Sequence, residues 1–182
     1  MAPRRAQPTV IVEAGWQSTK LRLIALLFMG AGLVGLYFTP EILTSLTDVD
    51  GNLEPLNARI GLGGLIGGAS LLATLGMWLY VSVHVVSISR SGDDVVVRTQ
   101  GVFRPTTRII PITGFIGSTA HDGRTKFPTR FQVNAPYTTL RIDGWWLPLV
   151  VDEQSETFHG DALGRIVQDS EMIRRRAATA RK

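Results

Sequence analysis

Two uncharged stretches dominate the first half of this chain: LIALLFMGAGLVGLYFTP at residues 23–40 and IGLGGLIGGASLLATLGMWLYVSVHVVSIS at residues 60–89. Neither stretch contains Asp, Glu, Lys or Arg. The hydrocarbon core of a bilayer is about 30 Å thick, and about 20 apolar residues of α-helix cross it. The pattern therefore predicts a transmembrane hairpin over residues 21–88, with spans at about 22–40 and 60–82 joined by an acidic loop at 41–59.

The charges beside these stretches predict the orientation of the hairpin. The N-terminal segment, residues 1–20, and the start of the first span are basic, whereas the loop carries Glu41, Asp48, Asp50 and Glu54 against Arg59 alone. Positively charged flanks stay on the cytoplasmic or matrix side of a membrane. We therefore expect both termini to face the cytoplasm at a bacterial inner membrane, with the mitochondrial inner membrane as the alternative. The first span is expected to be retained, because no small-x-small cleavage site follows it.

The second stretch is rich in glycine. Gly63 with Gly67 and Gly64 with Gly68 each follow the GxxxG spacing, and the first stretch contains a similar pair. That pair is Ala31 with Gly35. Small residues four positions apart let two helix backbones approach closely. We favour the interpretation that these residues pack the two spans together, and docking of a partner's helix is the alternative.

After the second span the spacing of apolar residues changes from the pattern of a helix to the alternation of apolar and polar residues that is typical of strands. Short β-branched and aromatic runs separated by Gly, Asp and Pro indicate antiparallel strands. We expect them at residues 83–90, 95–99, 107–112, 131–133, 138–143 and 145–151, with a loop over 121–130 and a break at 114–117. Alternation in the last strand predicts that one of Trp145 and Trp146 faces the core and the other faces outward. Apolar residues at helical spacing over 162–177 predict a C-terminal amphipathic helix with Asp161 as its N-cap.

Three segments of this region carry a resemblance to a known family. They are SRSGDDVVVRT at residues 89–99, TRIIPI at 107–112 and LPLVVD at 147–152. Together with the preceding spans, this order resembles bacterial pleckstrin-homology-like (bPH) membrane proteins and is similar to small mitochondrial two-span proteins that help assemble respiratory complexes. The resemblance implies that residues 89–182 form an antiparallel PH-like β-barrel or sandwich closed by a C-terminal helix, with a role in assembling membrane complexes.

The sequence offers little material for catalysis or metal binding. It contains no cysteine, which excludes thiolate catalysis, disulfides and Cys-based metal sites. The pairs His121–Asp122 and His159–Asp161 are typical of loops and helix caps, so we predict neither an enzyme nor a metal site. His84 is the candidate cofactor ligand, to a haem or a pigment beside the hairpin. We favour a hydrogen-bonded surface residue at that position.

The remaining candidates are contact residues for a partner or for lipid: Trp145, Trp146, Arg104, Arg174, Arg175 and Arg176. The chain has 19 basic against 15 acidic side chains, a net charge of +4. Attraction to anionic phospholipids explains such an excess near a membrane. The sequence lacks the motif of interleaved aromatic and basic residues that nucleic-acid-binding platforms use, so we predict no nucleic-acid binding. We therefore predict a non-catalytic accessory or assembly subunit of a larger respiratory or photosynthetic membrane complex. The alternative is a membrane-anchored module that recognises anionic lipid or a small ligand.

Overall fold

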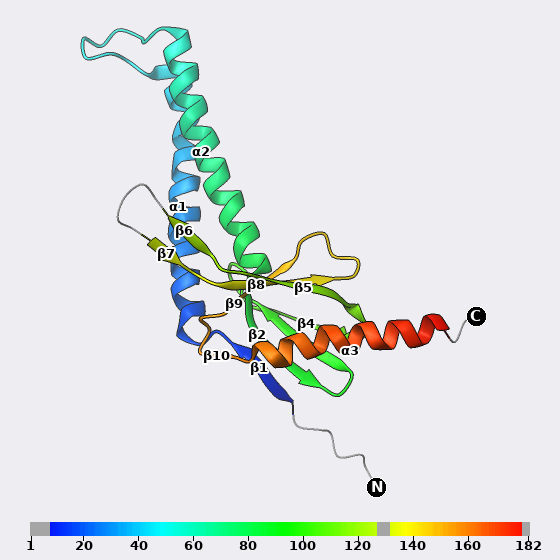
Figure 1. Cartoon of the computed structure of the whole chain (residues 1–182). Coiled ribbons are helices and arrows are strands. Elements are labelled where there is room, and N and C mark those ends of the chain that lie inside the picture. Colours follow the sequence, from blue (N-terminus) through cyan, green and yellow to red (C-terminus); the bar gives the residue numbers. More distant parts are fainter. Residues whose placement is uncertain (1–7, 127–131, 180–182) are drawn as a thin grey trace. The chain divides into compact units, whose positions relative to one another are not determined.

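The chain forms two compact units, which we call the helical hairpin (Leu21–Val81) and the β domain (Met1–Lys20 with Ser82–Lys182). The computed structural model describes residues 8–126 and 132–179 (Figure 1). The chain passes from the β domain into the hairpin and back again. The β domain is therefore assembled from segments on both sides of the hairpin.

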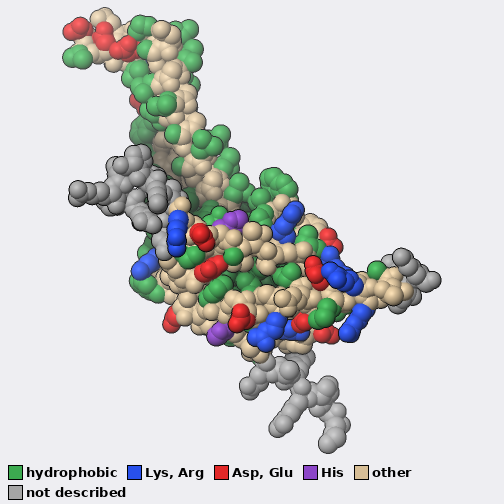
Figure 2. Space-filling view, viewed as in Figure 1, with side chains coloured by type: hydrophobic (Ala, Val, Ile, Leu, Met, Phe, Trp, Pro, Cys, Tyr) green, Lys and Arg blue, Asp and Glu red, His purple; other side chains and the backbone are tan. Residues whose placement is uncertain are grey.

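The hairpin is built from two long helices, α1 (Trp16–Ser45) and α2 (Leu56–Val83). Both are long and apolar enough to span a membrane, and their most apolar 18-residue windows are only 11% and 6% buried. At 1.5 Å per residue, each helix is about 40–45 Å long. Figure 2 shows apolar side chains along this unit. Each predicted span lies inside one of these helices. The predicted loop was too long, because α1 continues past Pro40 to Ser45.

The connector between α1 and α2 is a tight polar loop, as its composition predicted. The Oδ1 atom of Asp48 accepts hydrogen bonds from the backbone N–H groups of Asp50, at 3.0 Å, and Asn52, at 2.8 Å. Arg59 Nη1 donates to the carbonyl oxygens of Leu43, at 3.3 Å, and Thr44, at 3.2 Å. These two carbonyls lie in the last turn of α1, where no further helical N–H is available to them. Arg59 therefore caps α1 from the start of α2.

The β domain contains antiparallel sheets, which confirms that part of the predicted fold. A five-stranded sheet has the order β10-β1-β2-β3-β4. Its strands are β1 (Thr9–Glu13), β2 (Val85–Ser91), β3 (Asp94–Thr99), β4 (Thr106–Pro111) and β10 (Thr157–Phe158). A second sheet contains β5 (Phe115–His121), β8 (Tyr137–Ile142) and β9 (Leu149–Asp152), and a third pairs β6 (Arg124–Lys126) with β7 (Gln132–Asn134). The described strands thus form three sheets, and a closed barrel is not seen among them.

The core of the β domain lies between the two larger sheets and the C-terminal helix α3 (Gly160–Thr179). It contains Val12, Ile88, Val95, Val97, Phe115, Leu140, Leu149, Val151, Leu163 and Ile166, each at most 3% exposed. Alternate residues of β3 are buried, because successive side chains of a strand point to opposite faces. Helix α3 is fixed by an ion pair between Arg90 Nη1 and Asp169 Oδ2 at 2.7 Å. The predicted C-terminal helix is therefore confirmed.

The structure corrects five local predictions. The N-terminal segment is part of the sheet, since β1 pairs with both β2 and β10. The expected break at 114–117 is a 3-10 turn, η1 (Ile112–Gly114), followed at once by β5. The strand expected at 145–151 begins only at Leu149, because the chain turns at Gly144, whose φ is +73°. Helix α3 starts at Gly160, so Asp161 lies inside its first turn rather than at its N-cap. The loop expected over 121–130 is also wrong in its described part, because β5 extends to His121 and β6 occupies Arg124–Lys126. Residues 127–131, which include Phe131, lie outside the described residues.

Candidate interaction surfaces

The two GxxxG pairs of α2 face different surroundings. A Cβ atom placed on Gly63 would lie 2.7 Å from Leu43 of α1, and one on Gly67 would lie 3.0 Å from Thr39. A Cβ atom on Gly64 or Gly68 would meet no atom within 4 Å. Gly63 and Gly67 therefore pack the hairpin together, as favoured above. Gly64 and Gly68 lie on an open face of the helix.

The small residues of α1 show a similar division. Gly35 packs against the hydroxyl of Ser70, and a Cβ on Gly32 would lie 2.7 Å from the Ser70 carbonyl oxygen. Ala31 is exposed. The contact predicted for Ala31 is thus made by Gly32, because a step of one residue rotates the side chain by about 100° around the helix axis.

Trp145 and Trp146 lie in the turn between β8 and β9, and they face opposite environments as predicted. Trp145 packs against the core, whereas Trp146 is 88% exposed. The guanidinium carbon of Arg108 lies 4.5 Å from the centre of the Trp145 ring, a cation–π contact. Arg108 comes from β4, 37 positions earlier in the chain. It is one of several basic residues for which lipid contact was considered, but its contact with Trp145 was not predicted.

Two hollows flank this tryptophan turn, and each contains one arginine. The Arg108 hollow has a volume of about 410 Å³ and is lined by Ser82, Val83, Thr99, Arg108 and the turn itself. The Arg141 hollow has a volume of about 240 Å³ and lies on the other side, between Thr139, Arg141 and the turn. Neither hollow has Asp or Glu among its described lining residues. Both therefore favour an anion.

The Arg108 hollow is lined in part by Ser82 and Val83, the first residues of the β domain after the helical hairpin in the chain. Strand β2 starts at Val85, directly after α2. Gln100, just after β3, is 2% exposed; its backbone N–H donates to the His84 carbonyl at 2.8 Å, and its Nε2 donates to the Ser18 carbonyl at 2.8 Å. These bonds hold the β3–β4 loop beside the first turn of α1. We call the surface formed by the Arg108 hollow and the tryptophan turn the junction face. Elsewhere in the β domain, Trp16 is 65% exposed and Phe103 is 81% exposed.

The arginines expected to contact partners have different roles. Arg174 Nε donates to the Thr113 carbonyl at 2.8 Å, and Arg174 Nη2 lies 3.3 Å from Asp143 Oδ2. Arg174 therefore holds α3 to η1 within the domain. Arg175 forms an i,i+4 pair with Glu171 at 3.6 Å. Arg176 and Arg104 are exposed.

His84 is buried, only 5% exposed, rather than on the surface as expected. It lies between α2 and β2 and forms an isolated parallel bridge with Val150 of β9. Burial lowers the pKa of His84 from its ordinary value, and the nearby carboxylate of Asp152 opposes that shift. A neutral imidazole is suited to ligating a metal or haem. Among the described residues, however, no group of three or more His, Cys, Asp or Glu side chains is placed to hold a metal ion.

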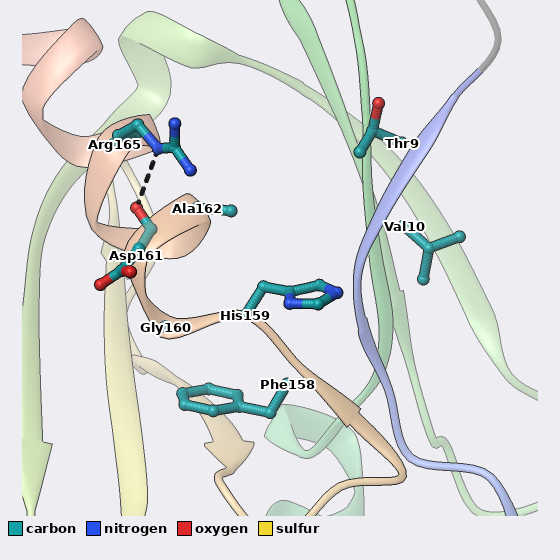
Figure 3. A pocket seen from close by; sticks show the side chains of 8 residues that line it. All are labelled: Thr9, Val10, Phe158, His159, Gly160, Asp161, Ala162 and Arg165. Atoms are coloured by element: carbon teal, nitrogen blue, oxygen red, sulfur yellow. Dashed lines mark hydrogen bonds between the residues drawn. The ribbon is translucent and has the colours of Figure 1, made fainter.

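The other two histidines lie on the surface of the β domain. His121 stacks on Tyr137, with ring centres 4.7 Å apart, and its Nε2 lies 3.3 Å from Thr139 Oγ1. His159 lines a hollow of about 490 Å³ between β1 and the start of α3 (Figure 3). The polar side chains there are exposed, and Arg165 Nε donates to the Asp161 carbonyl at 3.3 Å. His159 lies directly before α3, as predicted, whereas His121 is the last residue of β5 and pairs with Tyr137 of β8, so the loop predicted for it was wrong.

No protein-family model matches this chain, and no curated protein matches it. Its function is therefore inferred from the surfaces described above.

Proposed function

We propose that this protein is a non-catalytic accessory or assembly subunit of a larger membrane protein complex, of the respiratory or photosynthetic type. It binds its partners through the hairpin and through the β domain. The resemblance to bPH membrane proteins and to two-span assembly proteins supports this function. The hairpin is inserted in a bacterial inner membrane, with both termini cytoplasmic.

The observation that carries the proposal is the open glycine face of α2. Gly61, Gly64 and Gly68 have nothing within 4 Å of the position of a Cβ atom. Glycine in a helix interior is about 1 kcal/mol less favourable than alanine. Close packing of a second backbone against a glycine face is one way to offset that cost, since helices associate in lipid through such contacts. The hairpin already uses Gly63 and Gly67, so the open face is available for a helix of the partner.

The experiment compares two double substitutions on the same helix. Gly64→Leu/Gly68→Leu covers the open face and should leave the hairpin folded, but it should remove stoichiometric partners from the protein purified in mild detergent. Gly63→Leu/Gly67→Leu is the matched control, and it should lower the stability of the hairpin itself. Quantitative mass spectrometry of the purified material gives the partner ratio. An unchanged ratio for Gly64→Leu/Gly68→Leu argues against the proposal.

The alternative function, a membrane-anchored module for anionic lipid, is favoured by a different observation. The tryptophan turn has an arginine on either side and no acidic side chain among the residues described there. A subunit of a membrane complex can also bind lipid, so the two functions are compatible.

A further inference from the structure

We infer that the junction face of the β domain binds anionic phospholipids of the leaflet beside it. In this interaction Arg108 and Arg141 pair with lipid phosphodiesters, and Trp146 inserts at the headgroup level. The inference rests on the membrane insertion of the hairpin proposed above. It adds a ligand class and a binding site to that proposal.

The position of the Arg108 hollow along the chain determines its level relative to the lipid headgroups. Ser82 and Val83 line this hollow, and Val83 is the last residue of α2. On α1, the basic residues Lys20 and Arg22 come directly before the apolar stretch that starts at Leu23. Basic and aromatic side chains at the ends of a span lie at the level of the lipid headgroups. The hollow is therefore placed where phospholipid phosphates are present.

The chemistry of the Arg108 hollow suits a phosphodiester. The guanidinium carbon of Arg108 lies over the Trp145 ring, at 4.5 Å from the ring centre. Such stacking orients the planar group while its in-plane N–H donors stay available, and these donors match phosphate oxygens in a bidentate geometry. No Asp or Glu is among the described residues that line the Arg108 hollow. The positive charge of Arg108 is thus directed to a ligand.

The exposed side chain of Trp146 supplies the second half of the interaction. Trp146, which is 88% exposed, lines both hollows. An indole ring has an apolar body and a polar N–H, and it partitions to the membrane interface. An anionic leaflet satisfies the indole ring and the two arginines together.

The test measures lipid binding to the full chain, purified and delipidated in mild detergent. Three probes are added separately: dioctanoyl phosphatidylglycerol, dioctanoyl phosphatidylcholine and inorganic phosphate. Bound lipid is counted by native mass spectrometry, and phosphate binding is followed by thermal stabilisation. The inference predicts preferential binding of phosphatidylglycerol. Equal binding of the two lipids would overturn it, and stabilisation by inorganic phosphate equal to that by phosphatidylglycerol would assign the site to free anions instead.

Matched variants locate the site. Arg108→Gln/Arg141→Gln should weaken phosphatidylglycerol binding by about fivefold for each arginine removed. Arg175→Gln/Arg176→Gln removes the same charge from the end of α3 and should change binding little. Equal losses in the two variants would mean that binding follows overall charge, and the inference would be wrong.

Two further variants keep the test decisive if Arg108→Gln disturbs the fold. Arg108→Lys retains the charge but lacks the planar fork, and it should bind more weakly than the unaltered protein. Trp146→Ala removes an exposed side chain and should lower the affinity for both lipids, while the preference for phosphatidylglycerol remains. Unchanged binding by both variants contradicts the inference. Extraction of membranes with alkaline carbonate tests the insertion of the hairpin separately. A protein that stays in the membrane but binds the two lipids without preference would refute the lipid site and leave the proposed insertion intact.

Discussion

The hydroxyl of Ser170 donates a hydrogen bond of 2.6 Å to the carbonyl oxygen of Phe115, and both residues are at most 1% exposed. This bond joins the middle of α3 to the first residue of β5. Backbone carbonyls buried without a partner cost about 1–3 kcal/mol. The bond therefore fixes the position of α3 along the sheet.

The first prediction concerns this bond. Ser170→Ala should lower the free energy of unfolding by about 1–3 kcal/mol, because the Phe115 carbonyl loses its partner in a buried site. Thermal or denaturant unfolding in detergent micelles measures the change. Ser118→Ala, at an exposed position of β5, is the control and should have little effect. If both variants lower the free energy of unfolding by similar amounts, the buried hydrogen bond does not contribute more to stability than an exposed side chain does.

The second prediction concerns the packing of the hairpin. Gly63→Leu should destabilise it by about 1–3 kcal/mol, since the new side chain overlaps Leu43 of α1. Gly64→Leu should leave the stability of the isolated protein nearly unchanged. The resistance of the purified protein to unfolding in SDS gives both values. Equal effects would mean that the two glycine pairs are not on different faces.

The third prediction follows from the burial of His84. Because burial lowers its pKa, the folded protein takes up a proton at His84 less readily than the unfolded chain does. As the pH falls below the ordinary histidine pKa of about 6.5, the unfolded state gains a proton that the folded state does not, so the free energy of unfolding decreases. The unfolding midpoint should therefore be lower at pH 5.5 than at pH 7.5.

Substitution of His84 isolates this effect. His84→Gln should make the unfolding midpoint less dependent on pH over this range, whatever its stability at pH 7.5. The exposed His159 provides the control, and His159→Gln should retain the pH dependence of the unaltered protein. If His84→Gln keeps the full pH dependence, other groups cause it.

The fourth prediction concerns topology. A reporter that is active only in the cytoplasm, fused after residue 182, should be active, because the basic flanks of the spans remain on that side. The same reporter inserted at Gly51, in the acidic connector, should be inactive. Activity of a periplasmic reporter after residue 182 would reverse the orientation.

The sequence was informative where the signal is local. The uncharged stretches predicted both long helices, and the Gly92–Asp93 turn predicted the β2–β3 hairpin, in which Gly92 has a φ of +65°. Helical spacing after residue 160 predicted α3. These signals come from residues close together in the chain, where period and turn chemistry determine the structure.

Features that depend on distant residues were not predicted. Strand β1 has five residues and pairs with β2, more than 70 positions later, so its pattern alone does not distinguish it from a polar tail. The contact of Arg108 with Trp145 joins a strand to a turn in another sheet. Gly32 rather than Ala31 makes the contact with α2, because the packing of the two helices along their whole length sets the rotation of α1 about its axis. Tertiary packing decided all three cases.

The pairing of β1 with β2 also constrains how the chain can enter a membrane. Val12, just before α1, is paired with Ile88, just after α2, so the two ends of the hairpin must be on the same side of any bilayer that it crosses. If α1 alone crossed, β1 and β2 would be separated by lipid, and the five-stranded sheet would lose the pairing in its middle. During synthesis β1 cannot pair with β2 until both helices and β2 have been synthesised, because β2 follows them in the chain. The pairing of β1 with β2 is thus compatible with two crossings or with none, but not with one. This constraint on topology is independent of the charges beside the spans.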